Sequence, residues 1–230
     1  MLYEELINQY NNLTDEEKNA LLVYKSRLGR AINSLNNDEE EIEKIYTKYK
    51  KLLENPKNMF LAFTVFKDIH FDDLNQFKNS LLEIEKKVKE ISNKIVLPED
   101  MTVYRALSIP NEEDLIEISK SSLISTSFNI NECSKFLILT PGRGYKHYLY
   151  QINLEKFSPV AICPYAILLD EKEERLILTQ GQDQKEIILI KENYIFENVL
   201  ETETILNNDI SVNVIIVDAK IKEDIKNNKL

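Results

Sequence analysis

Three polar clusters in the second half of the chain carry side chains that could do chemistry together. Arg105 interrupts an apolar alternation, the sequence Ser-Thr-Ser follows at 125–127, and the acidic run Glu-Lys-Glu-Glu lies at 171–174. A guanidinium suits bidentate contact with an oxyanion, and carboxylates can stabilise developing positive charge. Taken singly, the three clusters are typical of a solvated strand residue, ordinary strand composition and a surface loop. Their occurrence together, in this order, is what indicates a site.

The predicted secondary structure that positions these clusters changes from helices to strands near Pro98. Before it, a capping box at Thr14–Glu17 precedes an apolar run, and a long amphipathic helix is predicted over residues 74–95. Its apolar residues recur at steps of three and four and therefore share one helical face. These are Leu74, Phe77, Leu81, Ile84, Val88, Ile91 and Ile95. We expect four or five helices in residues 1–97.

After Pro98 the apolar period shifts towards two, which predicts strands. The predicted strands cover residues 102–107, 122–128, 148–154, 176–178, 186–190, 194–196 and 212–217, and the predicted helices cover 112–120 and 131–136. The expected fold class is α+β, with a helical part at 1–97 and a largely antiparallel β part at 98–230. We expect the two parts to form one compact domain.

Composition excludes several classes of protein and site. The chain has 230 residues, 43% hydrophobic and 30% charged, which is enough for a proper core. Two cysteines and two histidines make a disulfide framework, a four-thiolate zinc site or a multi-histidine metal site unexpected, so no metal is predicted. The net charge is −2 over residues 1–97 and −8 over 98–230, which argues against nucleic-acid binding. No apolar run is long enough to span a membrane.

The clusters and their surroundings resemble the Arg–Ser–Glu class of mono-ADP-ribosyltransferases, of the bacterial exoenzyme and toxin type. The sequence Leu-Thr-Asp-Glu-Glu-Lys at 13–18 resembles that family's opening helices, and Thr-Val-Tyr-Arg-Ala-Leu at 102–107 resembles its first catalytic strand. Leu-Ile-Ser-Thr-Ser-Phe at 123–128 resembles its Ser-Thr-Ser strand, and residues 147–154 the strand after its nicotinamide-side loop. The resemblance spans roughly residues 13–178. It implies a helical part packed on a mixed, mostly antiparallel two-sheet β core. NAD would be bound in a cleft between the sheets, since no Gly-x-Gly-x-x-Gly sequence is present.

The resemblance assigns roles that suit the residue types. Cleaving the glycosidic bond of NAD builds an oxocarbenium ion, as in glycoside hydrolysis. Arg105 would bind the pyrophosphate, and Ser125 would orient a catalytic glutamate by a hydrogen bond. Thr126 and Ser127 would shape the strand and the nicotinamide pocket. The glutamate would bind the ribose 2′-hydroxyl and stabilise the developing charge.

Two assignments of that glutamate are open. In the family, an acidic-x-Glu sequence runs straight into apolar strand residues, and a Glu or Gln two residues before the catalytic glutamate positions the acceptor side chain. We take Glu173 as catalytic and Glu171 as its partner, which favours arginine as the acceptor by resemblance. The alternative takes Glu174 as catalytic and places Lys172 at the acceptor position. A β-bulge could reconcile either choice, because bulges re-aim side chains.

Two further residues are candidates for binding NAD. Arg143 lies in the glycine-containing sequence Pro-Gly-Arg-Gly-Tyr at 141–145, where the family keeps a loop over the nicotinamide phosphate. A plain turn is the other interpretation of that sequence. Tyr24 resembles an aromatic residue near the adenosine side, and core packing is its other interpretation.

The predicted function is NAD-dependent mono-ADP-ribosylation of a protein side chain, with release of nicotinamide and an accompanying NAD glycohydrolase activity. The partners expected are NAD, as substrate, and a protein acceptor. The alternative is a catalytically inactive module of the same fold, used for binding or immunity. A partner-binding coiled coil at residues 74–95 is a third interpretation, but its stripe covers only about three heptads. No Sec signal is visible. The resemblance implies a bacterial or phage protein delivered into a host cytoplasm as an effector or toxin component.

Overall fold

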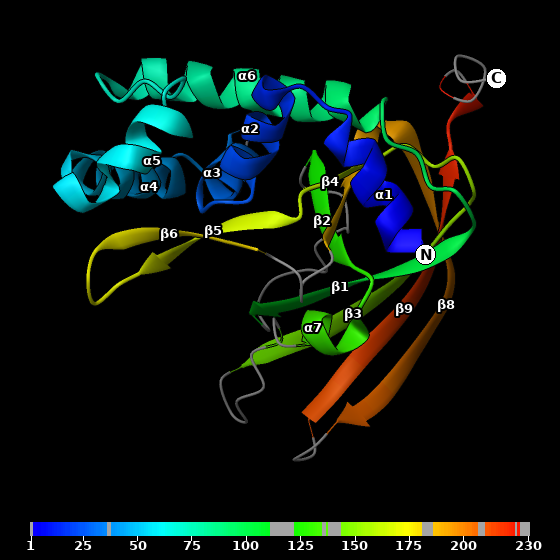
Figure 1. Ribbon diagram of the computed structural model, residues 1–230. Helices are drawn as coiled ribbons and strands as arrows, with labels where there is room; N and C mark the ends of the chain where they lie inside the picture. Colours follow the sequence, from blue (N-terminus) through cyan, green and yellow to red (C-terminus); the bar gives the residue numbers. More distant parts are fainter. Residues whose placement is uncertain are drawn as a thin grey trace. The chain divides into compact units, whose positions relative to one another are not determined.

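The computed structural model of the chain shows an α+β fold, in which helices come first and mostly antiparallel strands follow (Figure 1). The residues that it describes are 2–35, 38–110, 122–134, 137, 144–180, 186–206, 210–223 and 225. The fold class and the order of its parts confirm the sequence prediction. The chain divides into two compact units. One comprises residues 1–6, 95–160 and 183–230, here called the sheet unit, and the other comprises 7–94 and 161–182, here called the helical unit.

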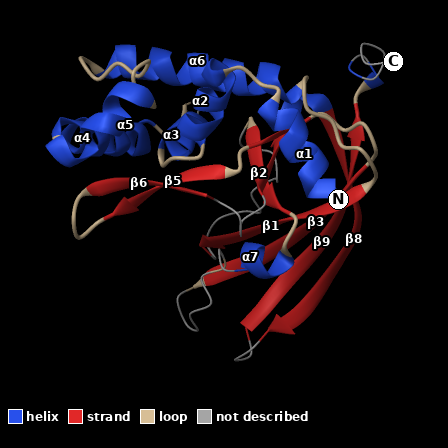
Figure 2. Cartoon of the chain, in the orientation of Figure 1, coloured by secondary structure: helices blue, strands red, loops and turns tan. Residues whose placement is uncertain are grey.

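Helices make up most of the helical unit (Figure 2). The bounds of the helices in the first part of the chain are α1 Leu2–Asn11, α2 Asp15–Tyr24, α3 Leu28–Ser34, α4 Glu39–Glu54, η1 Pro56–Asn58, α5 Met59–Thr64 and α6 Leu74–Ser92. The predicted capping box is confirmed, since the Thr14 hydroxyl accepts from the Glu17 amide (3.2 Å) and the Glu17 carboxylate accepts from the Thr14 amide (2.9 Å).

The long helix α6 buries the predicted apolar stripe within its own unit. Phe77, Leu81, Ile84, Val88 and Ile91 are all buried, and α6 packs on α2. Burying a side chain of this size is worth about 2 kcal/mol, so the stripe is core. The stripe packs against other helices of the same unit, so a partner-binding coiled coil is not needed to explain it.

Two strands of the second half belong to the helical unit. β5 (Tyr165–Asp170) and β6 (Arg175–Gln180) form a two-stranded antiparallel hairpin. This confirms the predicted strand at 176–178, but the strand pairs only with β5 among the described residues. The sequence prediction placed residues 161–182 in the β-rich part of the chain, whereas contacts group them with the helices of residues 7–94.

A seven-stranded sheet organises the sheet unit, in the order β4-β7-β2-β1-β3-β9-β8. Their bounds are β1 Met101–Pro110, β2 Leu123–Ser127, β3 Tyr145–Leu154, β4 Val160–Ile162, β7 Glu186–Ile190, β8 Tyr194–Leu206 and β9 Ile210–Ile221. β3 and β9 run parallel, and the other pairs with described registers are antiparallel. The remaining predicted strands are therefore confirmed, most of them longer than predicted.

A short helix, α7 (Ile130–Ser134), follows β2, where a helix at 131–136 was predicted. The helix predicted at 112–120 lies outside the described residues. The middle of the sheet is held by branched aliphatic side chains without exposed surface, among them Val103, Ile152 and Ile188. Branched residues pack well on a pleated surface, which is why these segments form strands.

Candidate active site

β2 and β7 pair antiparallel and bring a glutamate beside the Ser-Thr-Ser sequence. Ser127 lies directly opposite Glu186, and Ser125 lies opposite Ile188. Residues opposite each other in an antiparallel pair project from the same face, and so do residues two apart on one strand. Glu186 therefore shares a face with both serines. Ser127 is its direct neighbour, and Ser125 is its diagonal neighbour, within reach of a long side chain.

Sequence reasoning missed Glu186, although the signal was present. Gln184-Lys185-Glu186 runs straight into the apolar sequence Ile-Ile-Leu-Ile at 187–190. This is the form that the family requires, with Gln or Glu two residues before the catalytic glutamate. The acidic run at 171–174 drew attention because it holds more carboxylates. Gln184 and Lys185 themselves lie outside the described residues.

Arg105 lies on β1, the neighbour of β2 on the side away from β7, and its side chain contacts β2. β1 and β2 pair only at Tyr104 and Ser127 among the described residues, and Arg105 is the residue after Tyr104. The Arg105 guanidinium donates from Nη1 to the carbonyl oxygen of Ser125 (2.9 Å). Ser125 and Ser127 are two residues, about 7 Å, apart along β2. The guanidinium is thus held at the Ser125 carbonyl, and the residue of β1 in the same row as Ser127 and Glu186 is Tyr104.

The middle residue of the Ser-Thr-Ser sequence ties the two strands together. Thr126 is buried, and its hydroxyl donates to the carbonyl oxygen of Ile187 (2.8 Å). Ile187 follows Glu186 directly, so this bond fixes the backbone beside the carboxylate. Ser127 is also buried, and its hydroxyl oxygen accepts from the amide of Asn129 (3.1 Å), which shapes the turn after β2.

Two groups that interact with Arg105, the Cys133 thiol and the Tyr150 hydroxyl, are neutral at physiological pH. Burial raises the pKa of the Cys133 thiol to about 11, and Arg105 acts in the opposite direction. Burial also raises the pKa of Tyr150 to about 12, with smaller contributions from neighbouring Tyr148 and Glu201 and an opposing one from Arg105. Neither Cys133 nor Tyr150 supplies a negative charge to the guanidinium.

The predicted carboxylates at 171–174 lie in the turn between β5 and β6, in the helical unit. Glu171 accepts hydrogen bonds from Arg27 (2.9 Å) and Lys48 (3.4 Å), and these two cations hold the pKa of its carboxyl below the usual value. Glu173 pairs with Lys57 (3.5 Å) and Glu174 with Lys51 (3.4 Å), among side chains that are more than half exposed.

Backbone geometry also separates this turn from a strand. Glu174 has φ +48°, in the left-handed region that is typical of turns. The structure therefore brings Glu171, Glu173 and Glu174 together with cations of the helical unit. Arg105 and Ser125 belong to the sheet unit.

The two remaining predicted NAD contacts have different outcomes. Tyr24 is buried in the helical unit, and its hydroxyl accepts from Asn33 Nδ2 (3.4 Å). This environment is that of a core residue. Arg143 lies outside the described residues, and the neighbouring Tyr145 is the first residue of β3.

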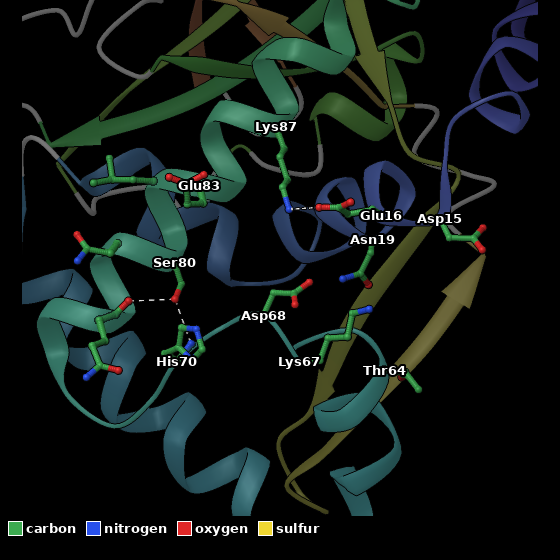
Figure 3. A pocket seen from close by; sticks show the side chains of 13 residues that line it. Asp15, Glu16, Asn19, Thr64, Lys67, Asp68, His70, Ser80, Glu83 and Lys87 are labelled. Carbon is green, nitrogen blue, oxygen red and sulfur yellow. Dashed lines mark hydrogen bonds and ion pairs between the residues drawn. The ribbon is translucent and has the colours of Figure 1, made fainter.

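A cavity of about 780 Å³ lies in the helical unit, between α2, the segment after α5, and α6 (Figure 3). Its lining is mainly polar, and Lys87 of α6 pairs with Glu16 of α2 (2.5 Å) across it. The His70 amide donates to the Ser80 hydroxyl (3.1 Å) at another wall. None of the residues predicted to bind NAD or to act in catalysis lines this cavity.

The described residues contain no group of three or more histidine, cysteine, aspartate or glutamate side chains placed to hold a metal ion. No helix formed by these residues combines the length and the apolar character needed to cross a membrane.

Comparison with known proteins gives a fold. No protein-family model matches the chain, and none of the curated proteins matches it in sequence. Among solved structures, Plx2a, an ADP-ribosyltransferase toxin from Paenibacillus larvae, is 14% identical and has a TM-score of 0.53, with 94% of this chain and 92% of that chain covered. Vis toxin, an ADP-ribosyltransferase from Vibrio splendidus, is 15% identical with a TM-score of 0.46, covering 98% and 86%.

The likeness to Plx2a extends over nearly the whole of both chains. It shows that this chain has the fold of bacterial ADP-ribosyltransferase toxins, which the sequence resemblance predicted. At this level of identity the comparison establishes the fold and leaves activity to be argued from the site.

Proposed function

We propose that the chain is a mono-ADP-ribosyltransferase of the Arg–Ser–Glu class, which transfers ADP-ribose from NAD to a protein side chain and releases nicotinamide. The observation that carries this proposal is the arrangement on β2. A glutamate lies opposite Ser127 in one neighbouring strand, and an arginine from the other neighbouring strand bonds to Ser125. The Plx2a-like fold supports it.

The proposed roles follow from the chemistry of the reaction. The bond between nicotinamide and ribose breaks with its electron pair leaving on nicotinamide, and the ribose develops oxocarbenium character. The Glu186 carboxylate binds the ribose 2′-hydroxyl and stabilises that positive charge. Ser125 or Ser127 orients the carboxylate, and Arg105 binds the pyrophosphate. The acceptor atom then bonds to the ribose carbon and loses its proton.

We propose Glu186 in place of Glu173 or Glu174 as the catalytic carboxylate. A strand fixes the direction of a side chain, and Glu186 is paired with the serine strand through its own backbone. Glu173 and Glu174 occupy a turn and are paired with Lys57 and Lys51. A preorganised carboxylate stabilises a transition state better than one that must first leave a cation.

The choice of Glu186 as the catalytic glutamate changes which acceptor residue type is expected. Arginine was predicted because Glu171 precedes Glu173 by two residues. Gln184 holds the equivalent position before Glu186. A neutral amide both donates and accepts hydrogen bonds, so it suits a neutral acceptor side chain as well as a guanidinium. We therefore propose a protein acceptor without naming its residue type, which mass spectrometry of the modified protein identifies.

The test measures nicotinamide release from NAD by the wild-type chain and by three glutamine variants. Glu186→Gln keeps the size of the side chain and removes its charge, so we expect a loss of at least 100-fold in turnover. Glu173→Gln and Glu174→Gln are matched controls in the exposed turn and should keep wild-type turnover. A circular dichroism melt of each variant confirms that it is folded.

Other outcomes are equally informative. Loss of turnover in Glu173→Gln or Glu174→Gln, with Glu186→Gln active, would restore the first assignment. No turnover by the wild type, with or without a host lysate, would favour the inactive binding module. Labelled NAD added to the lysate, followed by mass spectrometry, identifies the acceptor residue.

A further inference from the structure

β8 forms one edge of the seven-stranded sheet and exposes both of its faces. Among the described strands it pairs with β9 on one side only. All eight residues from Glu197 to Thr204 are exposed, including Val199 (58%) and Leu200 (49%). An edge strand presents unpaired backbone N–H and C=O groups, which are a template for pairing with another chain.

The charge of this edge is entirely negative. The segment Tyr194–Leu206 contains Glu197, Glu201 and Glu203 and no lysine or arginine. Lys220 of β9 pairs with Glu197 (2.7 Å), and the Ser211 hydroxyl donates to Glu203. Two copies of this strand placed edge to edge would bring like charges together, which disfavours self-pairing. A basic extended segment would meet complementary charge.

The sheet register connects this edge to the proposed NAD site. Arg105 lies opposite Tyr150, Tyr150 lies opposite Ile215, and Ile215 lies opposite Glu201. Directly opposed residues project from one face, so Arg105 and Glu201 begin on the same face of the sheet, in one row. Three strand spacings of about 4.8 Å place their backbones about 14 Å apart. A protein held at β8 therefore lies in the row of Arg105, the proposed pyrophosphate-binding residue.

We propose that the outer edge of β8, from Glu197 to Thr204, binds a basic extended segment of the acceptor protein by strand addition. This inference rests on the proposed function, because it names the partner of that same site. Backbone pairing supplies affinity, and Glu201 and Glu203, with the exposed Val199 and Leu200 at the register shift of β8, select arginine- or lysine-containing sequences. The chain's net charge of −10 steers such a segment towards it.

The test uses the full chain and a labelled 12-residue peptide that alternates arginine and valine. Its affinity is measured by fluorescence anisotropy against three proteins: wild type, Glu201→Lys/Glu203→Lys, and Glu43→Lys/Glu90→Lys. The last pair changes net charge equally at exposed helical positions of the other unit. We expect at least a tenfold weaker affinity for the β8 variant alone. The same peptide with alternate N-methylated amides should bind at least tenfold more weakly to the wild type, since it cannot complete the strand pairing.

Several results would overturn the proposal. Equal weakening in both double variants would mean that net charge alone attracts the peptide. Full binding of the N-methylated peptide would exclude strand addition. Unchanged peptide affinity with new self-association of the β8 variant would show that the glutamates only protect the edge. Nicotinamide release from NAD is measured on the same samples, so a failure of the proposed activity is recognised separately from a failure of this surface.

Discussion

At the residue scale, the position of a carboxylate in the backbone decides what it can do. Glu186 begins a strand, and the pairing with β2 fixes the face from which it projects. The carboxylates of the 171–174 turn are exposed and form ion pairs with Arg27 and with lysines of the helical unit. Exposed pairs of this kind contribute at most about 1 kcal/mol each. These pairs therefore fix the direction of the 171–174 carboxylates less firmly than strand pairing fixes that of Glu186.

One partly buried cation, Lys25, gives a residue-scale prediction of pH dependence. Lys25 ends α2, and burial lowers its pKa to about 8, with the nearby Cys163 acting in the opposite direction. Between pH 8 and about 10.4, the unfolded chain holds a proton on this lysine that the folded chain has released. More protons bound in the unfolded state mean that this contribution to stability rises with pH.

The variant Lys25→Met should therefore be more stable than the wild type at pH 7, by about 2 kcal/mol, because it removes a buried charge. The difference should shrink as the pH approaches 10. Urea unfolding at pH 7, 8, 9 and 10 measures it, and referring each value to the wild type at the same pH cancels Cys163, whose own pKa burial raises to about 11. A difference that grows with pH would contradict this prediction.

At the element scale, one buried side chain joins the hairpin to the helices of its own unit. Asn58 is almost fully buried, and its amide nitrogen donates to the carbonyls of Leu52 (2.7 Å) and Glu174 (3.0 Å). Its amide oxygen accepts from the backbone N–H of Leu176 (2.7 Å). A single asparagine thus satisfies backbone groups at the end of α4 and at the start of β6.

Asn58→Ala should lower the free energy of unfolding by about 2 to 4 kcal/mol, because it leaves these buried backbone groups without their partner. Asn55→Ala is the matched control. Asn55 caps η1 through one exposed bond to the Lys57 amide (3.0 Å), and its loss should cost about 1 kcal/mol or less. Hydrogen exchange at the Leu176 amide should accelerate in Asn58→Ala. Equal losses in the two variants would show that Asn58 does not hold the hairpin.

At the scale of the whole molecule, the chain passes repeatedly between its two units. The sheet unit takes residues 1–6, 95–160 and 183–230, and the helical unit takes 7–94 and 161–182. Residues just before Pro98 belong to the sheet unit, since the Leu97 amide donates to the Ser158 carbonyl (3.0 Å) and the Val160 amide to the Ile95 carbonyl (3.0 Å). Neither unit is a continuous piece of sequence.

The fragment 98–230 should therefore show no cooperative thermal unfolding and no nicotinamide release. It lacks Ile95 and Leu97, which are fully buried, and it separates the hairpin from the helices that cover Ile167 and Leu176. Exposing these side chains to water removes several kcal/mol from a marginal stability. Circular dichroism melts of the fragment and of the full chain measure this. A cooperative melt of the fragment would show that the sheet unit folds without its N-terminal segments.

The sequence alone determined the fold class, the long helix and most of the strands, because apolar periodicity and caps act locally. The alternation around Arg105 and the hydroxyls of residues 125–127 also sufficed to predict two strands of the site. Only the tertiary structure decided which strand lies beside β2, since strand pairing joins residues about 60 positions apart and no local pattern encodes it. That pairing places Glu186 opposite Ser127, whereas charge density had favoured residues 171–174. Strand pairing also left β8 at the edge of the sheet, because among the described strands it pairs with β9 alone.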